Sequence, residues 1–191
     1  MMRQGRWRTC LPRGAVDRRL ASWLGEPGSL TARCQAASGE FRVRLLRFRR
    51  ARPLADEGSG RAMAQVREVL LECDGVPVIF AHTTLSTATG GRLSRWLARL
   101  GSRSLGSLLF AHPGFVRGAI EYRRLDRRHP LYRRVAEVAT AGVFLWARRS
   151  RHRLGRQEVL VTEVFLPAIA GLARRAADDC PGQKLTASPS A

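Results

Sequence analysis

The chain has 191 residues, 45% of them hydrophobic, and a formal net charge of +19. This length fits one globular domain whose core can enclose a small ligand, and it leaves little room for a second full domain. The charge alone would favour a polyanionic partner, such as nucleic acid or an acidic membrane surface, but Lys184 is the only lysine and the arginines are spread along the whole chain. We therefore predict no specific nucleic-acid binding, and only a positive field that attracts a small anionic substrate.

The cysteines and the hydrophobic pattern indicate the cellular compartment. Cys10, Cys34, Cys73 and Cys180 form no CxxC pair and no cluster with histidine, so we expect free thiols, no bound metal and a reducing compartment. The basic N-terminus lacks an apolar run of signal-peptide length, and no stretch approaches the roughly 18 apolar residues of a membrane span. The sequence thus predicts a soluble, cytoplasmic protein.

Composition divides the chain into three parts. Residues 1–14 are rich in arginine, and residues 179–191 are mostly small and polar. We predict a flexible basic N-terminus and a flexible C-terminal tail on either side of one domain, which spans residues 15–178.

The first part of the domain predicts two short helices and a strand. Apolar residues recur at helical spacing over 16–24 and stop before Gly25, and Ser29 is a suitable N-cap for a second helix. From Phe41 the hydrophobic period changes to two, as in a half-exposed strand, and residues 51–62 are typical of a loop.

The first β-hairpin is the clearest local signal. Residues 63–73 and 76–85 are rich in β-branched and apolar side chains, and an Asp-Gly dipeptide that suits a tight type I′ turn joins them. The spacing of leucine and tryptophan then predicts a helix over 93–101, and residues 104–110 are typical of a further short helix.

A second hairpin follows a segment that is dense in charge. We predict that this segment, residues 121–140, is an excursion from the sheet, a solvated loop in preference to an extension of a lid. The hairpin pairs residues 143–154 with 158–166, and Pro167 ends the strand and opens a C-terminal helix to about residue 175. Strands joined by hairpins, with helices set between them, indicate an antiparallel α+β domain.

Two charged residues lie in strands where buried side chains are expected. Arg67 shares a strand face with Val69, and Glu163 lies between Val161 and Phe165. Burial of either charge is strongly unfavourable unless hydrogen bonds or an opposite charge compensate it. One interpretation is a structural ion pair, formed between the two or with other residues. The other places both at one cavity, where the guanidinium binds a ligand carboxylate and the glutamate meets the ligand's opposite polar end.

No P-loop, GxGxxG, GxSxG or HExxH motif is present. Five segments in a fixed order, between Trp23 and Pro167, instead resemble the chorismate pyruvate-lyase family: WLGEPGSLTARC, VREVLLECDGVPVIFAHTTL, LGSLLF, LWARRSRHRL and LVTEVFLPA. The resemblance implies a single α+β domain with a six-stranded antiparallel sheet flanked by helices. It also implies helical flaps over an internal ligand site, in a protein that is usually a monomer.

The resemblance further implies roles for single residues. Arg67 matches the arginine that binds the ring carboxylate of substrate and product, and Glu163 matches the glutamate that meets the ring hydroxyl. The backbone N–H of Leu105 would help to hold the carboxylate, and Leu30 would help to close the pocket. His82 stands where many relatives have arginine, and it is either a weaker, pH-dependent cationic contact or an ordinary polar strand residue.

The activity implied by the family is the cofactor-free conversion of chorismate into 4-hydroxybenzoate and pyruvate, the first committed step of ubiquinone synthesis. We expect Arg67 and Glu163 to be the catalytic residues. The alternative is a non-catalytic domain that senses an aromatic carboxylate, because the effector-binding domain of some transcription regulators resembles the same fold.

Overall fold

The structure, a computed structural model, describes residues 6–12, 14–57, 62–86, 95, 99–101, 103, 105, 114–155 and 157–172. The helices named within these residues are α1 (Arg18–Leu24), α2 (Leu30–Ala36) and α5 (Pro130–Ala136). The strands are β1 (Phe41–Ala51), β2 (Ala64–Cys73), β3 (Val76–Ser86), β4 (Val116–Arg117), β5 (Glu121–Leu125), β6 (Leu145–Leu154) and β7 (Gln157–Phe165).

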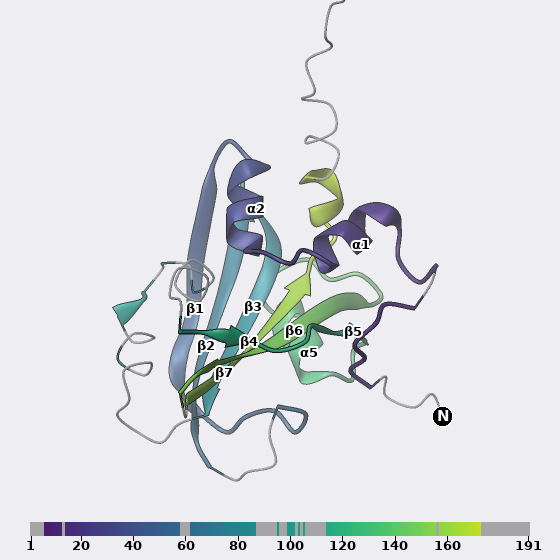
Figure 1. The fold of residues 1–191 in the computed structure, drawn as a ribbon. Coiled ribbons are helices and arrows are strands. Elements are labelled where there is room, and N and C mark those ends of the chain that lie inside the picture. Colours follow the sequence, from purple (N-terminus) through teal and green to yellow (C-terminus); the bar gives the residue numbers. More distant parts are fainter. Residues whose placement is uncertain are drawn as a thin grey trace, which may run out of the picture.

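The strands form one antiparallel sheet (Figure 1). Its order is β1-β2-β3-β7-β6, and the short strands β4 and β5 both pair with the free edge of β6. Because β4 and β5 follow one another along the same edge, the sheet is six strands wide. The predicted α+β class with an antiparallel sheet is confirmed, as are both hairpins.

The turn between β2 and β3 has the backbone geometry that its dipeptide favours. Asp74 and Gly75 adopt φ angles of 50° and 76°, the left-handed values of a type I′ turn. We predict that Gly75→Ala lowers the free energy of unfolding by about 1–2 kcal/mol, because a side chain is unfavourable at this φ. Gly171→Ala is the matched control, since neither glycine has an atom within 4 Å of its ideal Cβ position and only Gly75 has a left-handed φ. Urea unfolding measures both, and an equal loss in the two variants would contradict the prediction.

Helices α1 and α2 cover one face of the sheet. Each begins at a side-chain cap. Asp17 Oδ1 accepts from Leu20 N at 2.9 Å, and the predicted cap Ser29 accepts through Oγ from Ala32 N at 3.3 Å. The core beneath them includes Trp23, Leu24, Leu30, Cys34, Val43, Val69, Leu71, Val78, Ile79 and Phe165. This packing holds the first turn of α2 above the sheet.

Helix α5 covers the opposite face, in the segment for which we predicted a solvated loop, so that prediction is wrong. Leu131, Tyr132 and Val135 of α5 are buried in a second core. Their spacing is helical, His129 accepts a hydrogen bond from Leu131 N, and Pro130 occupies the first turn. The arginines around these residues masked a short amphipathic pattern.

Strand β5 begins the same segment, and its charged residues are also partly buried. Arg123 is 9% exposed, and its Nη1 donates to Asp56 Oδ2 at 2.7 Å, which compensates the buried charge. Asp56 also accepts from Trp7 Nε1 at 2.7 Å, and Arg8 exchanges backbone hydrogen bonds with Tyr122 of β5. Part of the segment predicted to be a flexible N-terminus therefore contacts the domain.

Several predicted elements lie wholly or partly outside the described residues. These are most of the helices over 93–101 and 104–110, the C-terminal helix beyond residue 172, and the C-terminal tail.

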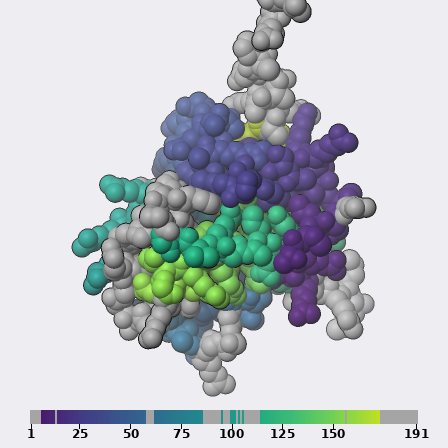
Figure 2. Space-filling view, viewed as in Figure 1, coloured from purple at the N-terminus to yellow at the C-terminus, as the bar shows by residue number. Residues whose placement is uncertain are grey.

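The space-filling view shows the segment of β4 and β5, in green, running across the molecule below α1 and α2 (Figure 2). This segment brings Arg117 of β4 to the face of the sheet that α2 covers.

Candidate active site

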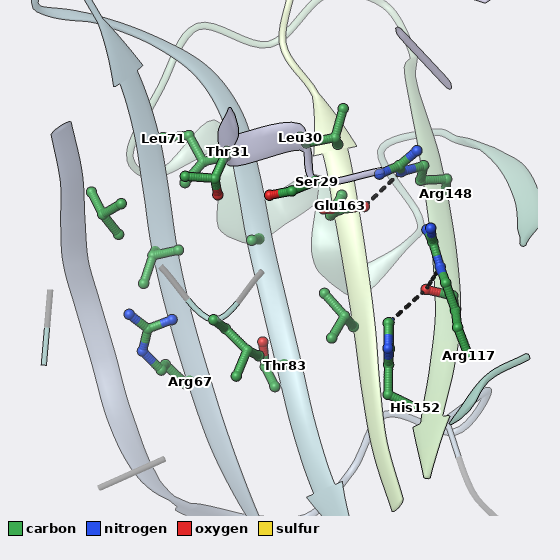
Figure 3. Close-up of a pocket in the computed structure, with 16 residues that line it drawn as sticks. Ser29, Leu30, Thr31, Arg67, Leu71, Thr83, Arg117, Arg148, His152 and Glu163 are labelled. Carbon is green, nitrogen blue, oxygen red and sulfur yellow. Dashed lines mark hydrogen bonds and ion pairs between the residues drawn. The ribbon is translucent and has the colours of Figure 1, made fainter. Parts of the chain in front are cut away.

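A pocket lies between the first turn of α2 and the sheet (Figure 3). It is lined by Ser29, Leu30, Thr31, Val43, Arg67, Val69, Leu71, Ala81, Thr83, Leu105, Arg117, Arg148, Ser150, His152, Val161 and Glu163. The residues that β2, β3, β6 and β7 contribute are two apart on each strand, because alternate side chains point to the same face of a sheet. All four predicted site residues, Arg67, Glu163, Leu30 and Leu105, are among them.

Arg67 enters the pocket from β2 as a buried cation. It is 3% exposed, its Nη2 donates to the backbone oxygens of Gly101 and Arg103 at 2.8 Å each, and its buried Nε has no hydrogen-bond partner among the described residues. Burial lowers the pKa of Arg67 to about 10, so the guanidinium remains charged at neutral pH. Among the described residues no carboxylate lies within ion-pair distance of it, and a pair between Arg67 and Glu163 is not formed. The site is therefore suited to an anionic ligand.

Glu163 enters the pocket from β7 and is held by a neighbouring strand. Arg148 Nε donates to Glu163 Oε2 at 2.6 Å, and Arg148 Nη1 donates to the backbone oxygens of Leu24 and Glu26 at 3.2 and 2.6 Å. Arg148 is 1% exposed, so this ion pair is shielded from water on the arginine side. The ion-pair interpretation thus holds for Glu163, with Arg148 as its partner, and the carboxylate is fixed in direction at the pocket wall.

The polar residues that β4 and β6 contribute to the pocket were not predicted as site residues from the sequence: Arg117, Arg148, Ser150 and His152. A signal for Arg148 was present, because the second hairpin pairs Leu154 with Gln157 and this register sets Arg148 directly opposite Glu163. Directly opposed residues share a sheet face. Arg117 lies in the two-residue strand β4, which leaves no periodic signal in the sequence.

Leu30 and Leu105 are the apolar members of the predicted site. Leu30 is 2% exposed at the start of α2, and Leu105 is 6% exposed. Both line the pocket together with Val69 and Val161. An aromatic ring between these side chains would be largely removed from water.

His82 lies on the opposite face of the sheet from the pocket, between Ala81 and Thr83, which do line it. Its Nε2 is 3.0 Å from Glu57 Oε1, and its Nδ1 is 2.9 Å from Glu68 Oε1. His82 is 1% exposed. It is therefore no direct contact of the pocket, and it instead links β2, β3 and the loop that contains Glu57.

The His82 cluster predicts a pH dependence of stability. Burial by itself lowers the pKa of His82, but the hydrogen bonds and charges of Glu57 and Glu68 outweigh it and raise the pKa above 6.5. The charged imidazole therefore stabilises the fold fully below pH 6.5, and this contribution is lost as the pH rises through the folded-state pKa.

Two measurements check this prediction. Urea unfolding is expected to give a free energy that declines as the pH rises above 6.5, and NMR of the His82 ring is expected to give a midpoint above 6.5. His152, whose pKa burial lowers to about 4, is the internal control because its shift has the opposite sign. A His82 midpoint at or below 6.5 would contradict the prediction.

Neither a metal centre nor a membrane span is found in the part of the chain that the structure describes. No group of three or more His, Cys, Asp and Glu side chains there could hold a metal ion. No helix there is long and apolar enough to cross a membrane.

Comparison with known proteins gives matches over most of the chain. A probable chorismate pyruvate-lyase of Dechloromonas aromatica (strain RCB) is 66% identical over 172 residues, which cover 88% of this chain and 98% of the relative. Another, from Methylobacillus flagellatus, is 43% identical over 173 residues, which cover 87% and 96%. Among solved structures, a GntR-family transcriptional regulator from Bacillus cereus matches 68% of this chain and 93% of its own at 15% identity, with a TM-score of 0.47. That likeness is too low to bear on fold or function.

A family model agrees with these relatives. The model described as chorismate lyase matches residues 2–174, which include every strand and helix described above. With this match and a relative that is 66% identical, the chain belongs to the chorismate lyase family.

Proposed function

We propose that this chain is a chorismate pyruvate-lyase, an enzyme that converts chorismate into 4-hydroxybenzoate and pyruvate without a metal or cofactor. Membership of the family and the name of a relative that is 66% identical support this function. The structural observation that best supports this function is that the buried cation of Arg67 and the Glu163–Arg148 pair line the same pocket, on different walls.

The pocket suits an aromatic ring with a carboxylate at one end and a hydroxyl at the other. The ring carboxylate would accept hydrogen bonds from Arg67, including one from its unpartnered Nε, and would compensate the buried charge. The backbone N–H of Leu105 would add a donor to the same carboxylate. Glu163 would accept a hydrogen bond from the ring hydroxyl, and Leu30 would pack on the ring face.

The reaction breaks two bonds of the substrate. The ether C–O bond to the enolpyruvyl group breaks, its electron pair leaves with enolpyruvate, and enolpyruvate takes up a proton to become pyruvate. The ring carbon that bears the hydroxyl loses its proton, and the ring becomes aromatic. Aromatisation supplies a strong driving force, so the protein has mainly to fix one reactive conformation and to stabilise developing charge.

Glu163 is the residue to which we assign the proton movement. Its carboxylate, oriented by Arg148 at 2.6 Å, would hold the ring hydroxyl and assist removal of the proton from the same carbon. Arg67 would anchor the ring at the other end, which fixes the distance between the reacting carbon and the carboxylate.

Incubation of the purified protein with chorismate, without added metal, tests the proposed activity. Chromatography is expected to show equal amounts of 4-hydroxybenzoate and pyruvate, and a heat-inactivated sample serves as the control. Unreacted chorismate together with clear binding of 4-hydroxybenzoate would contradict the lyase and favour a sensor of aromatic carboxylates.

We extend the proposal to the setting of the enzyme. It would act as a cytoplasmic monomer at the first committed step of ubiquinone synthesis. Sedimentation of the purified protein checks the monomer, and growth of a strain that lacks its own chorismate lyase, with and without 4-hydroxybenzoate in the medium, checks the pathway.

A further inference from the structure

The charge of the pocket exceeds what a single carboxylate requires. Its sixteen described lining residues include Arg67, Arg117 and Arg148 and, as the one acid among them, Glu163. With His152 neutral, these described residues carry a net charge of +2. Because Arg148 is engaged with Glu163 at 2.6 Å, the second cationic position of the pocket is Arg117.

Arg117 lies on the wall opposite Arg67. One row of paired residues crosses the sheet from Arg67 to Thr83, Val161 and Ser150. The row spans three strand spacings, about 14 Å between the backbones of β2 and β6. Arg117 Nε donates to the hydroxyl of Ser150 at 3.2 Å, which places the two guanidinium groups across the cavity from one another (Figure 3).

Neighbouring groups hold Arg117 in this position. Its Nη1 donates to the backbone oxygen of Pro27 at 2.5 Å, and Ser150 Oγ is 3.1 Å from His152 Nε2. Ser150 and His152 are each 4% exposed. Burial, with the nearby charges of Arg117 and Arg148, lowers the pKa of His152 to about 4, so the ring is neutral beside the guanidinium and does not repel an anion-binding arginine.

The substrate of the proposed reaction is a dicarboxylate. One carboxylate is on the ring and the other is on the enolpyruvyl group that leaves, whereas 4-hydroxybenzoate retains only the first. We propose that Arg117 binds the carboxylate of the enolpyruvyl group, and that Ser150 and His152 position Arg117 for this contact. The inference rests on the proposed function and adds to it a subsite for the leaving group, defined by Arg117, Ser150 and His152.

This subsite has a consequence for the reaction itself. As the ether bond breaks, its electron pair moves onto enolpyruvate, next to the carboxylate held by Arg117. A guanidinium at that position stabilises the negative charge as it develops. Arg117 is thus expected to affect turnover as well as substrate binding.

The difference between substrate and product provides the experiment. Arg117→Gln is expected to lower kcat/KM for chorismate about 100-fold, the effect of removing one partner of a buried charge pair, while the Kd for 4-hydroxybenzoate changes by less than about threefold. Arg117→Lys keeps the charge, and its kcat/KM for chorismate is expected to lie between the values of Arg117→Gln and the parent protein. Arg42→Gln removes an arginine whose side chain is 67% exposed on β1, and it controls for the loss of general positive field.

His152→Leu tests the positioning role. It leaves the charge of the pocket unchanged but removes the nitrogen that contacts Ser150, so kcat/KM for chorismate is expected to fall about tenfold with no change in 4-hydroxybenzoate affinity. A general loss of structure would instead weaken the binding of both chorismate and 4-hydroxybenzoate. Retained product affinity therefore also shows that each variant is folded.

Two outcomes would overturn the subsite. One is an unchanged kcat/KM in Arg117→Gln, and the other is an equal loss of chorismate turnover and of 4-hydroxybenzoate affinity. Failure of the proposed function is distinguishable, because the parent protein would then not convert chorismate at all. In that case the Kd values of chorismate and 4-hydroxybenzoate test the subsite. The subsite predicts that Arg117→Gln weakens the binding of chorismate and leaves the binding of 4-hydroxybenzoate unchanged.

Discussion

An Arg67→Gln variant is expected to bind 4-hydroxybenzoate about 100-fold more weakly than the parent protein and to lose at least as much in kcat/KM for chorismate. The guanidinium is 3% exposed, and a ligand carboxylate would provide the counter-charge that the described residues do not supply. Glutamine is shorter and neutral, so it cannot form a charge-assisted pair with that carboxylate. Isothermal titration calorimetry with 4-hydroxybenzoate measures the effect.

The stability of the same variant gives an independent test. Removal of a buried charge without a carboxylate partner is not expected to lower the melting temperature, although two hydrogen bonds to backbone oxygens are lost. Unchanged affinity for 4-hydroxybenzoate in Arg67→Gln would remove the anchor role. Arg42→Gln, on the exposed side of β1, should bind the product as the parent does.

A Glu163→Gln variant is expected to lose two to four orders of magnitude in kcat, the usual contribution of a positioned acid or base, while its affinity for 4-hydroxybenzoate changes only a few-fold. The amide has nearly the same shape, and its oxygen can still accept from Arg148 Nε, so the pocket should stay formed. The amide cannot take up a proton, and turnover should therefore fall. Steady-state kinetics with chorismate, followed by release of the aromatic product, measures kcat.

Glu158→Gln is the matched control for this change. Glu158 lies on the same strand, is also paired with arginines, at 2.6 and 2.9 Å, and is not a lining residue of the pocket. The Glu158→Gln substitution should therefore leave kcat for chorismate unchanged. Near-normal turnover in Glu163→Gln would instead show that the carboxylate only orients the hydroxyl.

Much of the fold could be predicted because it is specified locally. The type I′ turn at Asp74-Gly75 and the alternating pattern around it define the first hairpin, and the cap Ser29 defines the start of α2. Residues 121–140 could not be assigned in the same way. Their buried arginine, Arg123, is compensated by Asp56, which is 67 positions away in sequence.

The candidate site shows the same division between local and distant information. Arg67 and Glu163 stand out because a charge in an apolar strand is unusual. Arg117 becomes part of the site only through the pairing of β4 with β6, and no periodic signal marks a two-residue strand.

His82 illustrates a limit of strand periodicity. Both faces of this sheet are covered, one by α1 and α2 and the other by α5, so alternation separates two faces but does not tell which one bears the ligand. His82 and Thr83 are neighbours on β3, yet only Thr83 lines the pocket. The carboxylates that surround His82 come from β2 and from a loop before it.

A crystal structure of the protein with bound 4-hydroxybenzoate is the most direct test of the proposed active site. We predict one molecule in the pocket, with its carboxylate on Arg67 and its hydroxyl on Glu163. A ligand bound in the reverse orientation, or at another site while this pocket stays empty, would contradict the assignment of the pocket and of both residues.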